Sequence, residues 1–89
     1  MADKAQNKEA MKEAIETLNQ IASSSSTPKT IKKSITDLIV DLNNDEYSLS
    51  VRAANTISLL DDVTQDPNMP SYVRTQLWQA VSKLESIRE

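Results

Sequence analysis

The sequence has 89 residues, a length typical of one domain that folds without a metal ion or a disulfide to hold it together. It contains no cysteine, histidine or glycine. This composition excludes thiolate and imidazole catalysis, the usual zinc sites and glycine-rich phosphate-binding loops. With 10 basic and 13 acidic residues, the net charge of -3 argues mildly against a general coat of nucleic acid.

Four segments carry apolar residues at the three- and four-residue spacing of an amphipathic helix. They are predicted over about residues 4–22, 28–43, 49–65 and 70 to near the end of the chain. The apolar positions of the first two are Met11, Ile15, Leu18 and Ile21, then Ile31, Ile35, Leu38, Ile39 and Leu42. Those of the last two are Ala53, Ile57, Leu60 and Val63, then Val73, Leu77, Ala80, Val81 and Leu84. Because the connections are short, consecutive helices are expected to run antiparallel.

The connections contain residues that cap helices. The expected N-cap residues of the second, third and fourth helices are Ser26 or Thr27, Ser48, and Asn68 or Met69. Pro28 and Pro70 are expected just inside the first turn, where a missing N–H does no harm. Asn43 or Asn44 is expected to end the second helix in the left-handed conformation that glycine usually adopts.

A shift of 42 residues aligns the first pair of helices with the second pair without a gap. Matching apolar positions and paired prolines predict an internal duplication. Within a single helical domain of residues 1–89, repeat one covers about residues 4–46 and repeat two about 47–88. Two-helix units of about 40–47 residues are the size of a HEAT-type repeat. The expected fold is all-α, an antiparallel four-helix arrangement from two tandem HEAT-like hairpins, with the second and fourth helices side by side.

Three stretches of the sequence resemble the small archaeal uncharacterised protein family 0147. They are "STPKTIKKS", "YSLSVRAANTISLL" and "LLDDVTQDPNMPSYVRTQLWQAVSKLE". The resemblance covers roughly residues 10–88, and "DPNMP…R…W" in residues 66–78 is its most specific part. It implies an archaeal, cytoplasmic and all-helical protein, and it brings no catalytic residue or assigned activity with it.

Trp78 lies one position off the apolar stripe of the last helix, where the first repeat has Thr36. Two interpretations are open. Trp78 is a part-buried residue at the edge of the core, or it anchors a partner surface together with Arg74 and Ser82, because Trp and Arg are favoured at interface anchors.

Lys29, Lys32 and Lys33 cluster in the first turns of the second helix, and Arg74 has the position equivalent to Lys32. Together they predict a modest basic rim for phosphate, RNA or an acidic partner. The alternative is an ordinary solvated surface, because no aromatic residue is interleaved for base stacking.

An acidic set ends the third helix and occupies the loop before it. Its members are Asp45, Glu46, Asp61, Asp62 and Asp66. A solvated face, a protein contact and a metal site are the alternatives, and the spacing does not match a calcium-binding loop.

We therefore predict no enzyme, no cofactor and no metal site, and the apolar runs are too short to span a membrane. The predicted function is a non-enzymatic protein–protein interaction module in the cytoplasm: an adaptor, a chaperone-like protein or a complex subunit. Its partner is an unknown protein or a second copy of the chain. The alternative is a binder of RNA or ribonucleoprotein that uses the basic rim.

Overall fold

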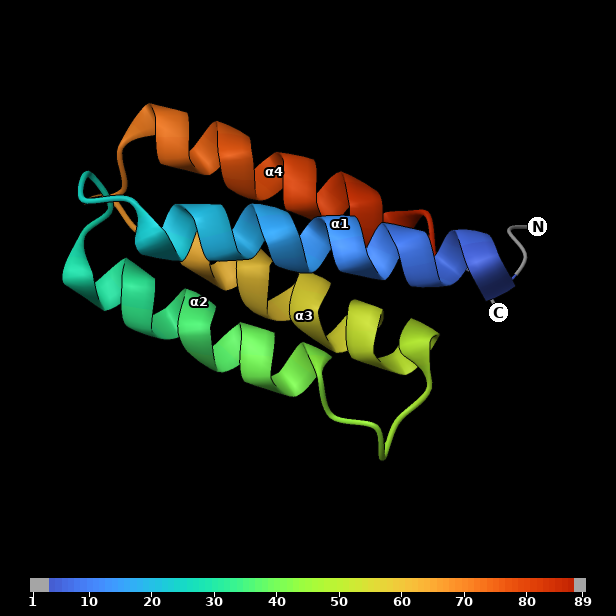
Figure 1. Cartoon of the computed structure of the whole chain (residues 1–89). Helices are drawn as coiled ribbons and strands as arrows, with labels where there is room; N and C mark the ends of the chain where they lie inside the picture. Colours follow the sequence, from blue (N-terminus) through green and yellow to red (C-terminus); the bar gives the residue numbers. More distant parts are fainter. Residues whose placement is uncertain (1–3, 88–89) are drawn as a thin grey trace.

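The computed structural model describes residues 4–87, which form four α-helices and no strand (Figure 1). The helices are α1 (Lys4–Ser23), α2 (Lys29–Leu42), α3 (Leu49–Thr64) and α4 (Ser71–Glu85). Each lies within one or two residues of its predicted segment, and consecutive helices run antiparallel. The all-α, four-helix prediction is therefore confirmed. None of the helices in residues 4–87 is both long and apolar enough to cross a membrane.

The helices form a ring in which α1 packs against α2 and α4, and α3 packs against the same two helices from the other side (Figure 1). α1 also approaches α3 across the centre, whereas within the described residues no Cα atom of α2 comes within 8 Å of one in α4. The expected side-by-side placement of α2 and α4 is therefore wrong, and the packing does not support the HEAT-like interpretation. The ring turns all four apolar stripes toward one axis, so each stripe is covered without a stacked repeat.

Most predicted apolar positions of both halves lie in the core, and the others, Ile15, Ile39, Ile57, Val63 and Val81, are partly buried and pack against it. Pairs of residues 42 positions apart that are both buried are Met11 and Ala53, Ala14 and Thr56, Leu18 and Leu60, Thr27 and Met69, Ile31 and Val73, Ile35 and Leu77, Leu38 and Ala80, and Leu42 and Leu84. The two halves therefore bury corresponding positions. The duplication itself and its boundaries stay a prediction.

The three loops, residues 24–28, 44–48 and 66–70, share one construction. In each, a side-chain oxygen of the first residue accepts a hydrogen bond from the backbone N–H two residues later. These pairs are Ser24 with Ser26 at 3.2 Å, Asn44 with Glu46 at 3.0 Å, and Asp66 with Asn68 at 2.9 Å. The last residue of each loop is the N-cap of the next helix.

Of the predicted N-caps, only Ser48 is confirmed, and its hydroxyl accepts a hydrogen bond from the Val51 N–H at 3.3 Å. Pro28 and Pro70 are the N-caps of α2 and α4, with φ of -57° and -60° and extended ψ. The predictions of Ser26 or Thr27, and of Asn68 or Met69, were one or two residues early. Proline fits this position because its fixed φ suits the extended backbone of an N-cap residue.

Asn43 and Asn44 do not adopt the left-handed conformation expected of them. The φ of Asn43 is -91°, and no residue in the range 4–87 has a positive φ. The Asn43 side-chain amide donates to the Ile39 carbonyl at 3.0 Å, so the end of α2 is satisfied without a left-handed residue. Thr27 does the same for α1, because its buried hydroxyl donates to the Ile21 carbonyl at 2.8 Å.

Candidate functional site

The predicted contact residue Arg74 caps α3. Its Nε donates to the Thr64 carbonyl at 3.0 Å and its Nη2 to the Asp66 carbonyl at 3.4 Å. These carbonyls lie at the end of α3, where the helix dipole favours a positive charge. The guanidinium of half-buried Arg74 therefore points toward α3, where two backbone carbonyls accept its hydrogen bonds.

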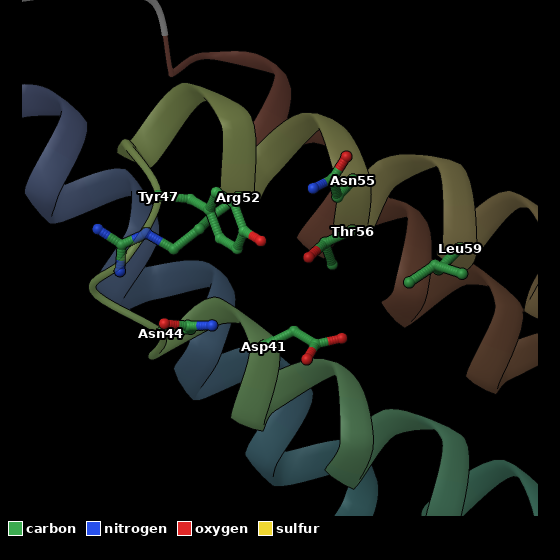
Figure 2. Close-up of a pocket in the computed structure, with 7 residues that line it drawn as sticks. All are labelled: Asp41, Asn44, Tyr47, Arg52, Asn55, Thr56 and Leu59. Atoms are coloured by element: carbon green, nitrogen blue, oxygen red, sulfur yellow. The ribbon is translucent and has the colours of Figure 1, made fainter.

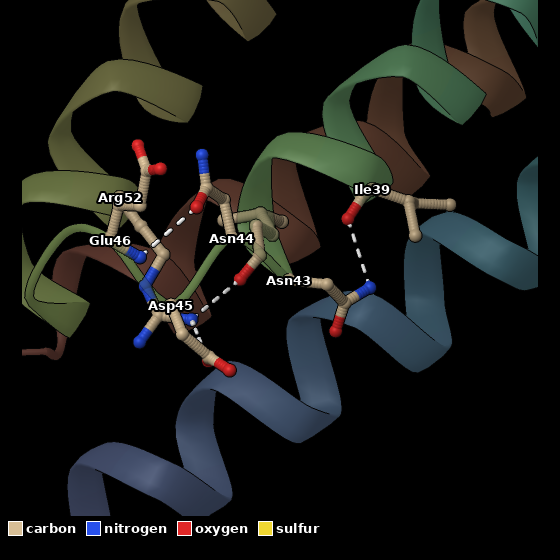
Figure 3. Close-up of polar contacts among 7 residues, drawn as sticks. Ile39, Asn43, Asn44, Asp45, Glu46 and Arg52 are labelled. Atoms are coloured by element: carbon tan, nitrogen blue, oxygen red, sulfur yellow. Dashed lines mark hydrogen bonds and ion pairs between the residues drawn. The ribbon is translucent and has the colours of Figure 1, made fainter.

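Arg52 makes the corresponding contact one helix earlier (Figure 3). Its Nη1 donates to the Leu42 carbonyl at the end of α2 at 2.9 Å and lies 3.8 Å from the carboxylate of Asp45. The Arg52 side chain is 14% exposed, and its Nε is buried without a hydrogen-bond partner. The sequence analysis did not predict this contact.

The structure does not bring the predicted basic rim together as expected. Lys29 and Lys33 are exposed and Lys32 is half-buried, and none of the three forms an ion pair with a described residue. α2 and α4 begin at the same end of the bundle, but they lie diagonally and Arg74 bonds to α3. Of the four residues of the predicted rim, the three lysines therefore present positive charges without an ion-pair partner among the described residues, and Arg74 does not belong to the same surface.

Trp78 lies on the outside of the bundle, with 57% of its surface exposed. Ser82, one turn later, is also exposed, and the helical spacing places both on the same face of α4 as Arg74. The core is filled without Trp78. The structure therefore favours the interpretation as a surface residue over that of a part-buried residue at the core edge.

The acidic set lies on the surface, apart from the half-buried Asp66. The Asp66 carboxylate belongs to the loop before α4, where it accepts the hydrogen bond from Asn68. Within residues 4–87 no three carboxylates come close enough to share a metal ion.

A groove that the sequence analysis did not anticipate runs between α2 and α3 (Figure 2). It has a volume of about 270 Å³ and is lined by Asp41, Asn44, Tyr47, Arg52, Asn55, Thr56 and Leu59. Figure 2 shows Thr56 on α3 pointing toward α2, where Asp41 lies, whereas the amide of Asn55 is turned away from Asp41 in this view. Tyr47 and Leu59 add apolar surface, with exposed fractions of 52% and 44%. We call this the α2–α3 groove.

Residues 1–87 match the Uncharacterised protein family (UPF0147). The chain is 39% identical to a UPF0147 protein of Sulfurisphaera tokodaii over the full length of both chains. It is 39% identical to one of Methanosarcina acetivorans, over 89% of this chain and 81% of the other. Both organisms are archaea, and neither name assigns an activity.

Two crystal structures have similar folds. The protein MMP1188, described as of unknown function, has a TM-score of 0.89 and 36% identity and covers 99% of this chain and 100% of its own. A UPF0147 protein from Thermoplasma acidophilum has a TM-score of 0.87 and 30% identity, over 94% of this chain and 99% of its own. The four-helix fold is therefore shared with these proteins.

Proposed function

The chain belongs to the Uncharacterised protein family UPF0147, and we propose that it acts as a non-enzymatic protein–protein interaction module in the cytoplasm. It serves as an adaptor, a chaperone-like protein or a subunit of a complex. The contact surface is the outer face of α4 that carries Trp78.

The observation that supports this proposal is the exposure of Trp78. It is the one tryptophan in the sequence, and 57% of its surface is open although seventeen apolar side chains nearby, from Ala10 to Ile87, form a filled core. An indole that stays exposed on folding still has a large apolar surface to bury. A partner that covers it gains that hydrophobic free energy and can accept a hydrogen bond from its one N–H donor. Tryptophan is accordingly enriched among the residues that dominate binding energy at interfaces.

A pull-down from the native cytoplasm tests this proposal. Tagged wild type, Trp78→Ala and Val40→Ala are compared with and without nuclease, and the captured proteins are identified by mass spectrometry. Val40 is the matched control, because it is also apolar and 65% exposed but lies on α2. We expect wild type and Val40→Ala to retain the same nuclease-resistant protein, and Trp78→Ala to lose it by a factor of about 30, as for an interface hot spot.

Tryptophan fluorescence then reports the site directly, because no other residue contributes an indole. Adding the captured partner should shift the Trp78 emission to shorter wavelength and protect it from acrylamide quenching. An unchanged emission, or equal capture by Trp78→Ala, would contradict a contact at this face.

Self-association is a specific case of the same proposal. The chain has a mass of 9.9 kDa, so sedimentation equilibrium separates a monomer from a dimer. A doubled mass that returns to the monomer value in Trp78→Ala would identify a second copy as the partner.

RNA binding is the second candidate, and the three lysines at the start of α2 favour it. They carry positive charge with no ion-pair partner among the described residues. Three phosphate contacts to single-stranded RNA should weaken binding about 20-fold between 50 and 200 mM salt, whereas an apolar interface should change little. Nuclease-sensitive capture that is lost in Lys32→Gln with Lys33→Gln, but not in Trp78→Ala, would favour RNA.

A further inference from the structure

Neighbouring helices of the ring meet at four interfaces, which we call seams. Two of them, the α1–α4 seam and the α2–α3 seam, correspond to each other. A shift of 42 residues carries α1 onto α3 and α2 onto α4, and most buried positions of one half correspond to buried positions of the other. Differences between the two seams therefore show where one half of the molecule departs from the other.

In the α1–α4 seam, Lys83 of α4 crosses to α1. Its Nζ lies 3.0 Å from Glu13 Oε2. Ala10 and Ala14 are buried beside this ion pair, and such small side chains let neighbouring helices approach closely. The hollow beside the pair has a volume of about 340 Å³ and is more open to solvent than the α2–α3 groove. A lysine ammonium and a carboxylate thus bridge this seam within the chain.

In the α2–α3 seam, the corresponding positions have different chemistry. Asp41 replaces Lys83 and Asn55 replaces Glu13, while Arg52 and Thr56 replace Ala10 and Ala14; these residues all line the α2–α3 groove. Asp41 forms no hydrogen bond or ion pair through its carboxylate with any described residue. The seam therefore has a carboxylate and no cation to bridge it.

We propose that the α2–α3 groove binds a lysine side chain of a partner protein. The ammonium lies between Asp41 on α2 and Thr56 on α3, where the carboxylate and the hydroxyl accept its hydrogen bonds. The aliphatic stem packs on Leu59. The 270 Å³ volume equals about nine water molecules, which is room for one such side chain.

Arg52 lines the loop end of the groove and forms no ion pair with Asp41. Its guanidinium bonds to the Leu42 carbonyl at the negative end of the α2 dipole and lies 3.8 Å from Asp45 (Figure 3). Asp41 is the residue immediately before Leu42, and its carboxylate forms no ion pair with Arg52 or any other described residue. The net charge of -3 further favours a basic partner.

This proposal rests on the proposed interaction function and adds a second contact surface, distinct from the Trp78 face. It is tested by following the ¹H–¹⁵N spectrum during titration with N-acetyl-lysine methylamide up to about 50 mM, a range that detects millimolar Kd values. N-acetyl-norleucine methylamide has the same stem without the charge and is the matched probe.

We expect saturable shifts at Asn44, Asn55, Thr56 and Leu59, and binding at least fivefold weaker for the norleucine probe. Asp41→Asn should weaken lysine binding by a similar factor, and the control Asp37→Asn, one turn earlier on α2, should not. The pair Asp41→Lys with Asn55→Glu copies the Lys83–Glu13 arrangement and should abolish binding without lowering the urea midpoint.

Several results would overturn the proposal: no localised shifts, equal binding of the norleucine probe, or unchanged binding by Asp41→Asn. Cadaverine that binds more than tenfold more tightly than the lysine probe would also overturn it, because the ligand would then be a free diamine. None of these results depends on Trp78. Failure of the groove and failure of the Trp78 surface are therefore distinguishable.

Discussion

Arg52 and Arg74 make the same contact at successive joints of the bundle. Each lies near the start of a helix and donates a hydrogen bond to the carbonyl ten residues earlier, at the end of the preceding helix, at 2.9 and 3.0 Å. The arginines therefore join α2 to α3 and α3 to α4. The side chain that provides the cap belongs to the helix that follows, so each cap also fixes the turn between two helices.

Replacing Arg74 by methionine should lower the free energy of unfolding by about 1–2 kcal/mol. Methionine keeps most of the apolar stem but removes the two donors to the end of α3, and hydrogen bonds from charged groups are worth about 1.5–3 kcal/mol when buried. Urea unfolding measures the change. Lys33→Met, at an exposed position, should stay within about 0.5 kcal/mol. Equal effects of the two substitutions would show that the cap contributes nothing.

Thr27→Val should destabilise the protein by about 1–3 kcal/mol. Valine has nearly the same shape but leaves the carbonyl of Ile21 without the hydroxyl that now donates to it at 2.8 Å in a buried setting. Thr75→Val is the control, because the Thr75 hydroxyl bonds to Ser71 on the exposed side of α4. Thermal unfolding should show a loss of several degrees for Thr27→Val. A melting temperature equal to that of the control would rule out this role of the hydroxyl.

Leu18→Ala and Leu60→Ala should each cost about 2–5 kcal/mol, because both side chains are fully buried at corresponding positions of the two halves. Leu59→Ala, on the neighbouring residue of α3, should cost far less because Leu59 is 44% exposed. Equilibrium unfolding in urea gives all three values. A small cost at either Leu18 or Leu60 would mean that the bundle collapses around the missing side chain.

The ion pair between Glu13 and Lys83 should contribute only about 0.2–1 kcal/mol. Both side chains are partly exposed, at 41% and 51%, so water screens the attraction. A double-mutant cycle with Glu13→Gln and Lys83→Met isolates the coupling. The coupling should fall further at 1 M salt. A salt-independent coupling well above 1 kcal/mol would contradict this account.

The helices and their buried faces could be predicted from the sequence because apolar periodicity is a local signal. Ile35 and Leu77, for example, are spaced with their neighbours so that only one face of each helix can be buried, and both are fully buried. The order of helices around the ring could not be predicted in this way. Each stripe fits more than one neighbour, and the packing of all four helices together decides between them.

The helix ends were predicted less well, for a physical reason. Ser26, Thr27 and Asn43 can each bond to the backbone in more than one way, and local sequence does not decide between an N-cap and a contact to the previous helix. Thr27 illustrates this, because its hydroxyl serves the end of α1 and not the start of α2.

The sequence contains a pattern that could have predicted the α2–α3 groove. When the two halves are aligned with a shift of 42 residues, Arg52 corresponds to Ala10, Thr56 to Ala14 and Asp41 to Lys83. Polar residues at positions that are alanine in the other half indicate a seam that is packed differently. The depth of the groove, however, depends on how closely two helices approach, which no residue pattern specifies.

The three loops also affect the unfolded chain. They turn the backbone three times with no glycine in the sequence and no positive φ among residues 4–87. Two of them end in proline, whose ring already restricts the disordered chain. Glycine at a turn commonly adds about 0.4–1 kcal/mol of conformational entropy to the unfolded state relative to alanine. Because its turns contain no glycine, this chain loses less conformational entropy when it folds. Part of its stability therefore comes from the restricted unfolded state and not from contacts in the folded one.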